Sequence, residues 1–421
     1  MQIEQKKFAE RRRFLICMVT LCISLAFVVQ GCGKPSRETW QDVDTEAETV
    51  IVLEEDEEPK IRMEDVCLEL YREAGRSGRL GEKETIAHIV KRFGENGYPA
   101  VDQKNRVDMV RASEVKRFCR RATDQQEAQI EIVEVDWNGG FVEYELQAAE
   151  GNLDVTRNYY HYEDEMMRKK TEEHFTADSW SYTEDGYLMF SGTGALDEMY
   201  VMTLSDVKEY AALRVEPLDE ACREWNEKAL LPVGYECNNL FLTDWDETDF
   251  GELDFYDLFD VFYPQVYHRK IPWQSGKNAG NSTAYEIPSK EFESVIQEFL
   301  NVKTDILRKK TIYREKDDTY EYYPRGFYES EYPEHPYPEV TAFQKNDDGT
   351  VTLTVHAVFP YLGSSRALVH EVTVRPMENA AAAVQYVSNK IISSLDDPDD
   401  NWYVPRLSGE ERSLLYEENT D

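Results

Sequence analysis

The chain has 421 residues and a formal net charge of −36, with 83 acidic residues against 47 basic ones. A surface this acidic repels other polyanions, so nucleic acid and anionic lipid headgroups are not expected partners. The net charge restricts the partners of the protein but does not indicate an activity.

The first 31 residues have the pattern of an export signal. The first thirteen carry five basic residues against two acidic ones, and residues 14–29 are almost wholly apolar. A permanent membrane helix needs about 20 apolar residues, so this shorter run fits the apolar part of a signal peptide better than an anchor.

The apolar run ends in Val29-Gln30-Gly31-Cys32, which resembles the bacterial lipobox. The resemblance implies a lipoprotein signal peptide over residues 1–31, cleavage before Cys32, and lipid on that cysteine. The lipid would hold the protein on the outer face of the cytoplasmic membrane. Val29 and Gln30 depart from the Leu and the small residue usual at these positions, and the alternative is an uncleaved anchor.

Four cysteines follow Cys32, namely Cys67, Cys119, Cys222 and Cys237. An even number in an exported protein permits two disulfides, and proximity favours Cys67 with Cys119 and Cys222 with Cys237, although three pairings are open. The alternative is four buried thiols, because Cys67, Cys119 and Cys222 fall on apolar faces of expected helices.

The N-terminal half predicts a tether followed by a first α+β unit. Residues 32–60 are rich in Asp and Glu and poor in apolar residues, which is typical of a disordered acidic tether. In residues 61–215, helical spacing of apolar residues predicts three helices between residues 63 and 122. Alternation from Ile130, a turn at Asn138-Gly139-Gly140, a strand over 155–159 and a turn at Asp185-Gly186 predict an antiparallel meander.

The C-terminal half predicts a connector, a second α+β unit and a tail. Residues 216–283 contain a helix near Pro217, an acidic aromatic stretch and a Gly/Asn/Ser-rich linker over 274–283. In residues 284–395, a helix capped by Ser289 precedes a turn at 346–349 and strands near 340, 351–359, 368–374 and 384–387. Residues 396–421 are predicted to form an acidic tail.

The predicted fold class is therefore α+β, with two units of a helix packed on an antiparallel meander and a helical lead-in. The two units have the same order of helix and strands, which is compatible both with duplication of one unit and with convergence. The second unit resembles the cystatin and nuclear-transport-factor-two folds, which host many functions. The chain after residue 31 also resembles lipoproteins of unknown function from Gram-positive gut bacteria, through runs at 234–235, 241–246 and 385–389, and no activity follows from that.

The most distinctive local motif covers residues 244–259. From Gly251 onward it resembles the second half of a calcium-binding EF-hand loop, but Phe250 would occupy a ligand position of the first half. An insertion of two residues aligns the acidic side chains, and gives a calcium candidate formed by Asp244, Asp246, Asp249, Asp254 and Asp257. The alternative is an acidic loop before a buried aromatic helix, with Leu253, Leu258, Phe259 and Phe262 inward. No other cofactor is expected.

Two further patterns are candidate binding sites. His356 and His370 lie on adjacent predicted strands, but pairing Leu353 with Val372 puts the two imidazoles on opposite faces and argues against a metal site. The tyrosine- and proline-rich stretch 320–338 is able to stack on sugars or bind an extended peptide, although rings covering a sheet edge are the favoured interpretation.

The chain contains no hydrolase, protease, phosphate-loop or dinucleotide motif, and its acidic residues are too abundant to single out a carboxylate pair. The sequence therefore predicts a non-enzymatic extracytoplasmic lipoprotein that binds or scaffolds an envelope or extracellular ligand, and its partners are the membrane and that ligand. One alternative is a glycan hydrolase with a carboxylate pair. Another is the solute-binding lipoprotein of a transporter, which would need parallel α/β lobes.

Overall fold

The computed structural model describes residues 62–193, 208–273, 284–329, 334–378, 381–395 and 402–417. The signal segment, Cys32, the tether and the linker at 274–283 lie outside these residues. Within them, no helix combines the length and the apolar character needed to span a membrane.

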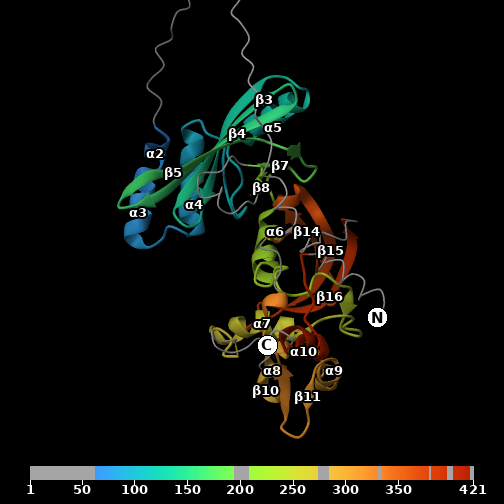
Figure 1. Ribbon diagram of the computed structural model, residues 1–421. Coiled ribbons are helices and arrows are strands. Elements are labelled where there is room, and N and C mark those ends of the chain that lie inside the picture. Colours follow the sequence, from blue (N-terminus) through green and yellow to red (C-terminus); the bar gives the residue numbers. More distant parts are fainter. Residues whose placement is uncertain are drawn as a thin grey trace, which may run out of the picture. The chain divides into compact units, whose positions relative to one another are not determined.

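The first half is built on a five-stranded sheet in the order β1-β2-β3-β4-β5 (Figure 1). The strands are β1 (Ala100–Asp102), β2 (Ala128–Asp136), β3 (Gly140–Ala149), β4 (Asn152–Glu163) and β5 (Met166–Thr176). The β2–β5 strands are antiparallel, and β1 is parallel to β2. The predicted turn at Asn138-Gly139-Gly140 is confirmed, and Gly140 is required there because an added Cβ would lie 2.3 Å from the Tyr160 carbonyl oxygen.

Four helices and a small second sheet cover this five-stranded sheet. The helices are α2 (Met63–Val66), α3 (Leu68–Ser77), α4 (Lys83–Glu95) and α5 (Ala112–Thr123), and the second sheet has β6 (Ser179–Tyr182), β7 (Tyr187–Thr193) and β8 (Lys208–Arg214). Alternate strand residues face different cores: Val133 and Phe141 pack with α3 and α4, whereas Ile132 and Tyr144 pack with α5 and the second sheet. Strands β2 and β3 therefore bury apolar side chains on both faces.

The second half is built on a sheet in the order β13-β14-β15-β16-β9 and a three-stranded sheet in the order β10-β12-β11. The strands are β9 (Trp245–Asp246), β10 (Tyr285–Pro288), β11 (Tyr313–Arg314), β12 (Thr319–Tyr322), β13 (Tyr337–Lys345), β14 (Val351–Phe359), β15 (Ser364–Pro376) and β16 (Val384–Ser394). The helices are α6 (Glu220–Trp225), the π-helix η1 (Asn226–Leu230), α7 (Phe255–Tyr267), α8 (Ser289–Phe299), α9 (Thr304–Lys310), the 3₁₀ turns η2 (Phe327–Glu329) and η3 (Pro360–Leu362), and α10 (Gly409–Glu417).

These elements confirm the α+β class with antiparallel sheets. Helix α8 buries Phe292, Val295, Ile296 and Phe299 as predicted, although Pro288 and not Ser289 holds the cap position. The residues predicted inward in α7, Leu258, Phe259 and Phe262, are all fully buried.

The organisation of the C-terminal half needs two corrections. One hydrophobic cluster runs from Cys222 to Trp402, so residues 216–273 supply core to the second unit and do not merely connect to it. The segment 402–417 is likewise no simple tail, because Trp402 is buried and helix α10, which follows it, contains the buried Arg412. Contacts also join residues 61–421 into a single unit.

Candidate functional site

A row of three aspartates marks the start of helix α7. Asp254 caps the helix by accepting hydrogen bonds from the backbone N–H groups of Tyr256 (2.9 Å) and Asp257 (3.1 Å). Asp257 and Asp260 follow at intervals of three residues, which keeps the three carboxylates on one side of the helix start. The adjacent side buries the aromatic residues of α7, so the aspartates lie at the edge of the core.

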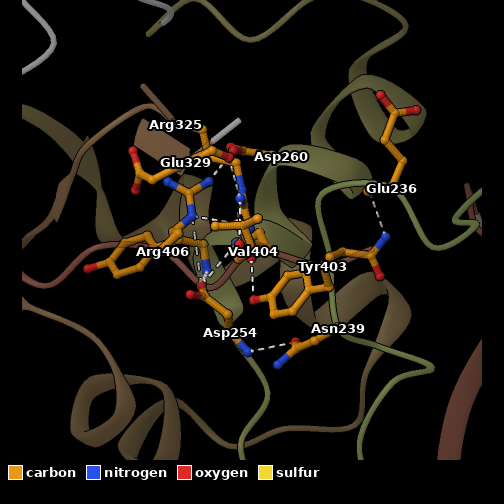
Figure 2. A network of polar contacts seen from close by, with 12 residues as sticks. Glu236, Asn239, Asp254, Asp260, Arg325, Glu329, Tyr403, Val404 and Arg406 are labelled. Atoms are coloured by element: carbon orange, nitrogen blue, oxygen red, sulfur yellow. Dashed lines mark hydrogen bonds and ion pairs between the residues drawn. The ribbon is translucent and has the colours of Figure 1, made fainter. Parts of the chain in front are cut away.

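Two arginines from distant parts of the chain close on this row (Figure 2). Arg325, in the segment after β12, makes a two-pronged contact with Asp257 through Nε (2.9 Å) and Nη2 (2.7 Å). Arg406, in the C-terminal segment, bonds Asp257 through Nε (2.5 Å) and Asp260 through Nη2. We call Asp254, Asp257, Asp260, Arg325 and Arg406 the α7 clamp.

Two tyrosine hydroxyls also donate hydrogen bonds to the aspartates of the α7 clamp. Tyr403 donates to Asp257 Oδ2 (2.8 Å), and Tyr322 donates to Asp260 Oδ1 (2.7 Å). Asp257 has no exposed surface and receives bonds from both arginines and from Tyr403. The carboxylate is therefore compensated by several charge-assisted bonds, as a buried charge must be.

A second buried ion pair lies beside the clamp. Arg412 Nη2 contacts Glu329 Oε1 at 2.6 Å, and both side chains are buried. Glu329 also accepts from the N–H groups of Gly326 (2.7 Å) and Leu407 (3.0 Å). The C-terminal segment is thus attached at Arg406 and again at Arg412.

Burial shifts the protonation of the outer aspartates. It raises the pKa of Asp254 and of Asp260 to about 6 in each case, and the nearby charge of Asp257 adds to both shifts. Burial alone would lower the pKa of Arg406, but Asp260 and Asp257 together raise it well above its usual value. Arg406 therefore stays cationic, whereas the outer carboxylates titrate closer to neutrality than exposed ones.

A pocket of about 450 Å³ opens beside the clamp. Asp260, Lys270, Tyr322 and Arg325 form its polar part, and Pro264, Ile271 and Pro324 complete the lining. Both Asp260 oxygens are already bonded to Arg406 and Tyr322, so the pocket presents a carboxylate that is held in place rather than an uncommitted base. Such a wall suits recognition of a polar ligand better than proton transfer.

The structure does not bring the calcium candidates together. Asp244 accepts from the Ile391 N–H (2.7 Å), Asp246 caps the turn at Thr248 and Asp249, and Asp254 and Asp257 belong to the clamp. Across the described residues, no group of three or more acidic, His or Cys side chains is arranged to hold a metal ion. Gly251 lies in a tight turn with a φ of +47°. A Cβ added at this position would lie only 2.6 Å from the Asp244 carbonyl oxygen, so the turn requires glycine.

The predicted strand register at the histidines is confirmed, with Leu353 opposite Val372 and Val351 opposite Val374. The two imidazoles consequently have different partners. His370 is fully buried and contacts Tyr235 and Asn389, whereas His356 lies 3.4 Å from Asp185.

The predicted disulfide pairings are not formed. Cys67, Cys119 and Cys222 are buried thiols in three different hydrophobic clusters, and half-buried Cys237 pairs with none of them. The alternative of buried thiols therefore holds for these three, because each packs as a small apolar residue.

The tyrosine-rich stretch contributes mainly to the core and to the clamp. Tyr320 and Tyr322 are buried on β12 against Phe292 and Phe259, whereas Tyr328 is 44% exposed. The interpretation of rings that cover a sheet edge from outside therefore does not hold for Tyr320 and Tyr322, which lie within strand β12 and belong to the core.

Sequence reasoning missed Asp260, Arg325, Tyr403 and Arg406. The three-residue spacing of Asp254, Asp257 and Asp260 was a usable signal, because it places acids beside the apolar face of a helix. Nothing in the sequence indicates that Arg406, some 146 positions further on, meets them.

The fold is that of an α+β protein with antiparallel sheets. In it, the α7 clamp attaches the C-terminal segment to the buried aromatic helix α7. The chain belongs to a family of unknown function, DUF6070, whose model matches residues 54–406. No curated protein and no solved structure matches the chain.

Proposed function

We propose that the protein is a lipid-anchored lipoprotein on the outer face of the cytoplasmic membrane that binds an envelope or extracellular ligand without catalysing a reaction. The observation that carries the anchoring is the basic, apolar and Gly31-Cys32 order of the N-terminus. The family match spans residues 54–406, so it begins after Cys32 and includes most of the residues that the structure describes.

The geometry at α7 supports binding over catalysis. A general acid or base must be able to exchange a proton with a bound substrate. Asp257 is enclosed by Arg325, Arg406 and Tyr403, and Asp260 is held on both oxygens. A polar ligand in the adjacent pocket would meet a rigid, charge-compensated wall.

The anchoring is tested by mass spectrometry of membranes from cells that make the intact protein, a Cys32→Ala variant, or a Cys17→Ala variant as a matched control within the apolar run. A diacylated peptide that begins at Cys32 should come from the intact protein and from Cys17→Ala, and should be absent from Cys32→Ala. An N-terminus that is uncut, or cut elsewhere without lipid, would overturn the anchoring.

A hydrolase is the second candidate, favoured by one observation. Asp260 lines the pocket and its pKa is raised to about 6, as general acids require. The test is glycan hydrolysis by the intact protein and by Asp260→Asn, with folding checked by circular dichroism. Hydrolysis that disappears in the folded variant would replace the binding role with an enzymatic one.

A further inference from the structure

A second, smaller pocket lies between the loop after β1, the α6–η1 segment and the start of β13. It is lined by residues 104–106, by residues of 218–231, and by residues 337–339, and its volume is about 40 Å³. Its size admits a hydroxymethyl-sized group or a few water molecules, so only one arm of a larger ligand could enter.

Three buried polar atoms of this pocket have no hydrogen-bond partner in the protein. They are Arg106 Nε, Asn226 Oδ1 and Glu227 Oε1. Arg106 Nε and Glu227 Oε1 are 3.3 Å apart, but their orientation does not make a hydrogen bond. Leaving buried polar atoms unsatisfied costs free energy, so three of them around one hollow indicate that a bound group completes them.

A π-helix positions two of these atoms. The Leu231 N–H bonds to the Asn226 carbonyl oxygen at 2.9 Å, which closes the wide turn of η1. Such turns are rare and occur often at functional sites. The wide turn carries Asn226 and Glu227, and Leu231, which is 40% exposed, follows it at the pocket.

The orientation of the Asn226 amide follows from its neighbour. Its Nδ2 donates to the Pro338 carbonyl oxygen at 2.9 Å, and a carbonyl can only accept. The Oδ1 atom is therefore the acceptor left for the pocket. The opposite wall is rigid, because both oxygens of buried Glu339 are already bonded to Arg214 and Tyr187 at 2.5 Å each.

The unsatisfied set combines two acceptors and one donor. An ammonium group could not accept from Arg106, and a carboxylate could not donate to Asn226 or Glu227. A hydroxyl group does both. Leu218 and Leu231 add apolar surface beside the polar atoms, suited to the C–H face of a ligand.

We propose that this pocket binds a hydroxyl arm of a saccharide or polyol. The site goes beyond the proposed function, because it depends neither on lipid anchoring nor on the α7 pocket.

The test is titration of the full-length protein in detergent with glycerol, glucose and N-acetylglucosamine, followed by calorimetry, with the same compounds soaked into crystals. At least one should bind with a hydroxyl on Asn226 and Glu227. Asn226→Ala and Glu227→Gln should each weaken binding about tenfold, because the first removes a buried hydrogen bond and the second replaces a charged acceptor with a neutral one. Leu231→Trp, which covers the mouth and leaves the polar atoms in place, should abolish binding.

Glu224→Gln is the matched control, since Glu224 lies on α6, is exposed and does not line the pocket, and it should bind as the intact protein does. Ordered water bridging the three atoms, with no heat of binding and no soaked compound, would overturn the proposal. Binding that is unchanged by all three pocket variants would overturn it as well. Neither result depends on whether Cys32 carries lipid.

Discussion

His370 lies inside the aromatic core of the second half with both ring nitrogens bonded. Tyr235 OH is 2.8 Å from Nε2, and Asn389 Oδ1 is 2.7 Å from Nδ1. Asn389 Nδ2 donates to the Thr243 carbonyl oxygen at 2.8 Å, which leaves Oδ1 as an acceptor. The proton of the neutral imidazole therefore sits on Nδ1, and Nε2 accepts from Tyr235.

Burial lowers the pKa of His370 to about 4. In the unfolded chain a histidine has a pKa of about 6.5, so between these values the unfolded chain binds a proton that the folded chain does not. The contribution to stability is present above pH 6.5 and is lost as the pH falls toward 4, by about 3 kcal/mol in total. Urea unfolding at stepped pH should show a flatter profile for His370→Gln than for the intact protein.

The control for this pH dependence is His88→Gln, on the exposed side of α4, which should keep the profile of the intact protein. An unchanged pH slope in His370→Gln would contradict the assignment of that slope to the buried imidazole.

At the scale of elements, the α7 clamp joins a helix to a segment that follows it by more than a hundred residues. A buried carboxylate between two arginines tolerates change poorly, since removing one partner leaves uncompensated charge. Asp257→Asn should therefore lower the free energy of unfolding by about 3 to 5 kcal/mol. Asp305→Asn, in an exposed pair with Lys309, should change it by about 0.5 kcal/mol or less.

Urea unfolding of the two variants measures this contrast. A cost at Asp257 as small as that at Asp305 would mean that the clamp adds little to stability.

The C-terminal segment should behave as part of the core. Removing residues 402–421 deletes Trp402, Tyr403, Arg406 and Arg412, and leaves Asp257 and Glu329 buried with fewer or no cationic partners. We expect that this truncation loses several kcal/mol of stability and becomes sensitive to limited proteolysis near α7, whereas removal of 418–421 alone does not. If the chain 1–401 resists proteolysis as well as the intact protein does, the segment is a tail, as the sequence predicted.

At the scale of the whole molecule, the cysteines lie in separate cores. Three thiols occupy three clusters and are protected by burial, which also raises the pKa of Cys119 to about 12. We expect Cys67, Cys119 and Cys222 to react with a thiol reagent only after unfolding, and reductant to leave the thermal midpoint unchanged. Peptide mapping without reductant that shows Cys67 joined to Cys119, or Cys222 to Cys237, would contradict this.

Local patterns in the sequence determined most elements of this protein. Helical spacing identified the buried face of α8, Gly-containing turns located the hairpins at 138–140 and 346–349, and strand alternation set the register of β14 against β15. These features depend on residues that are close in the sequence or that face each other across one turn. The amino-acid sequence alone therefore predicts them.

Only the tertiary structure decided which distant side chains meet. The acidic residues predicted to bind calcium serve as a helix cap, as turn caps and as part of the α7 clamp, and the segment predicted as a tail contributes Trp402 to the core. The unsatisfied atoms of the smaller pocket also come from segments more than a hundred residues apart. Such contacts depend on packing across the whole chain, and charged residues this numerous carry no local signal of which partner each will find.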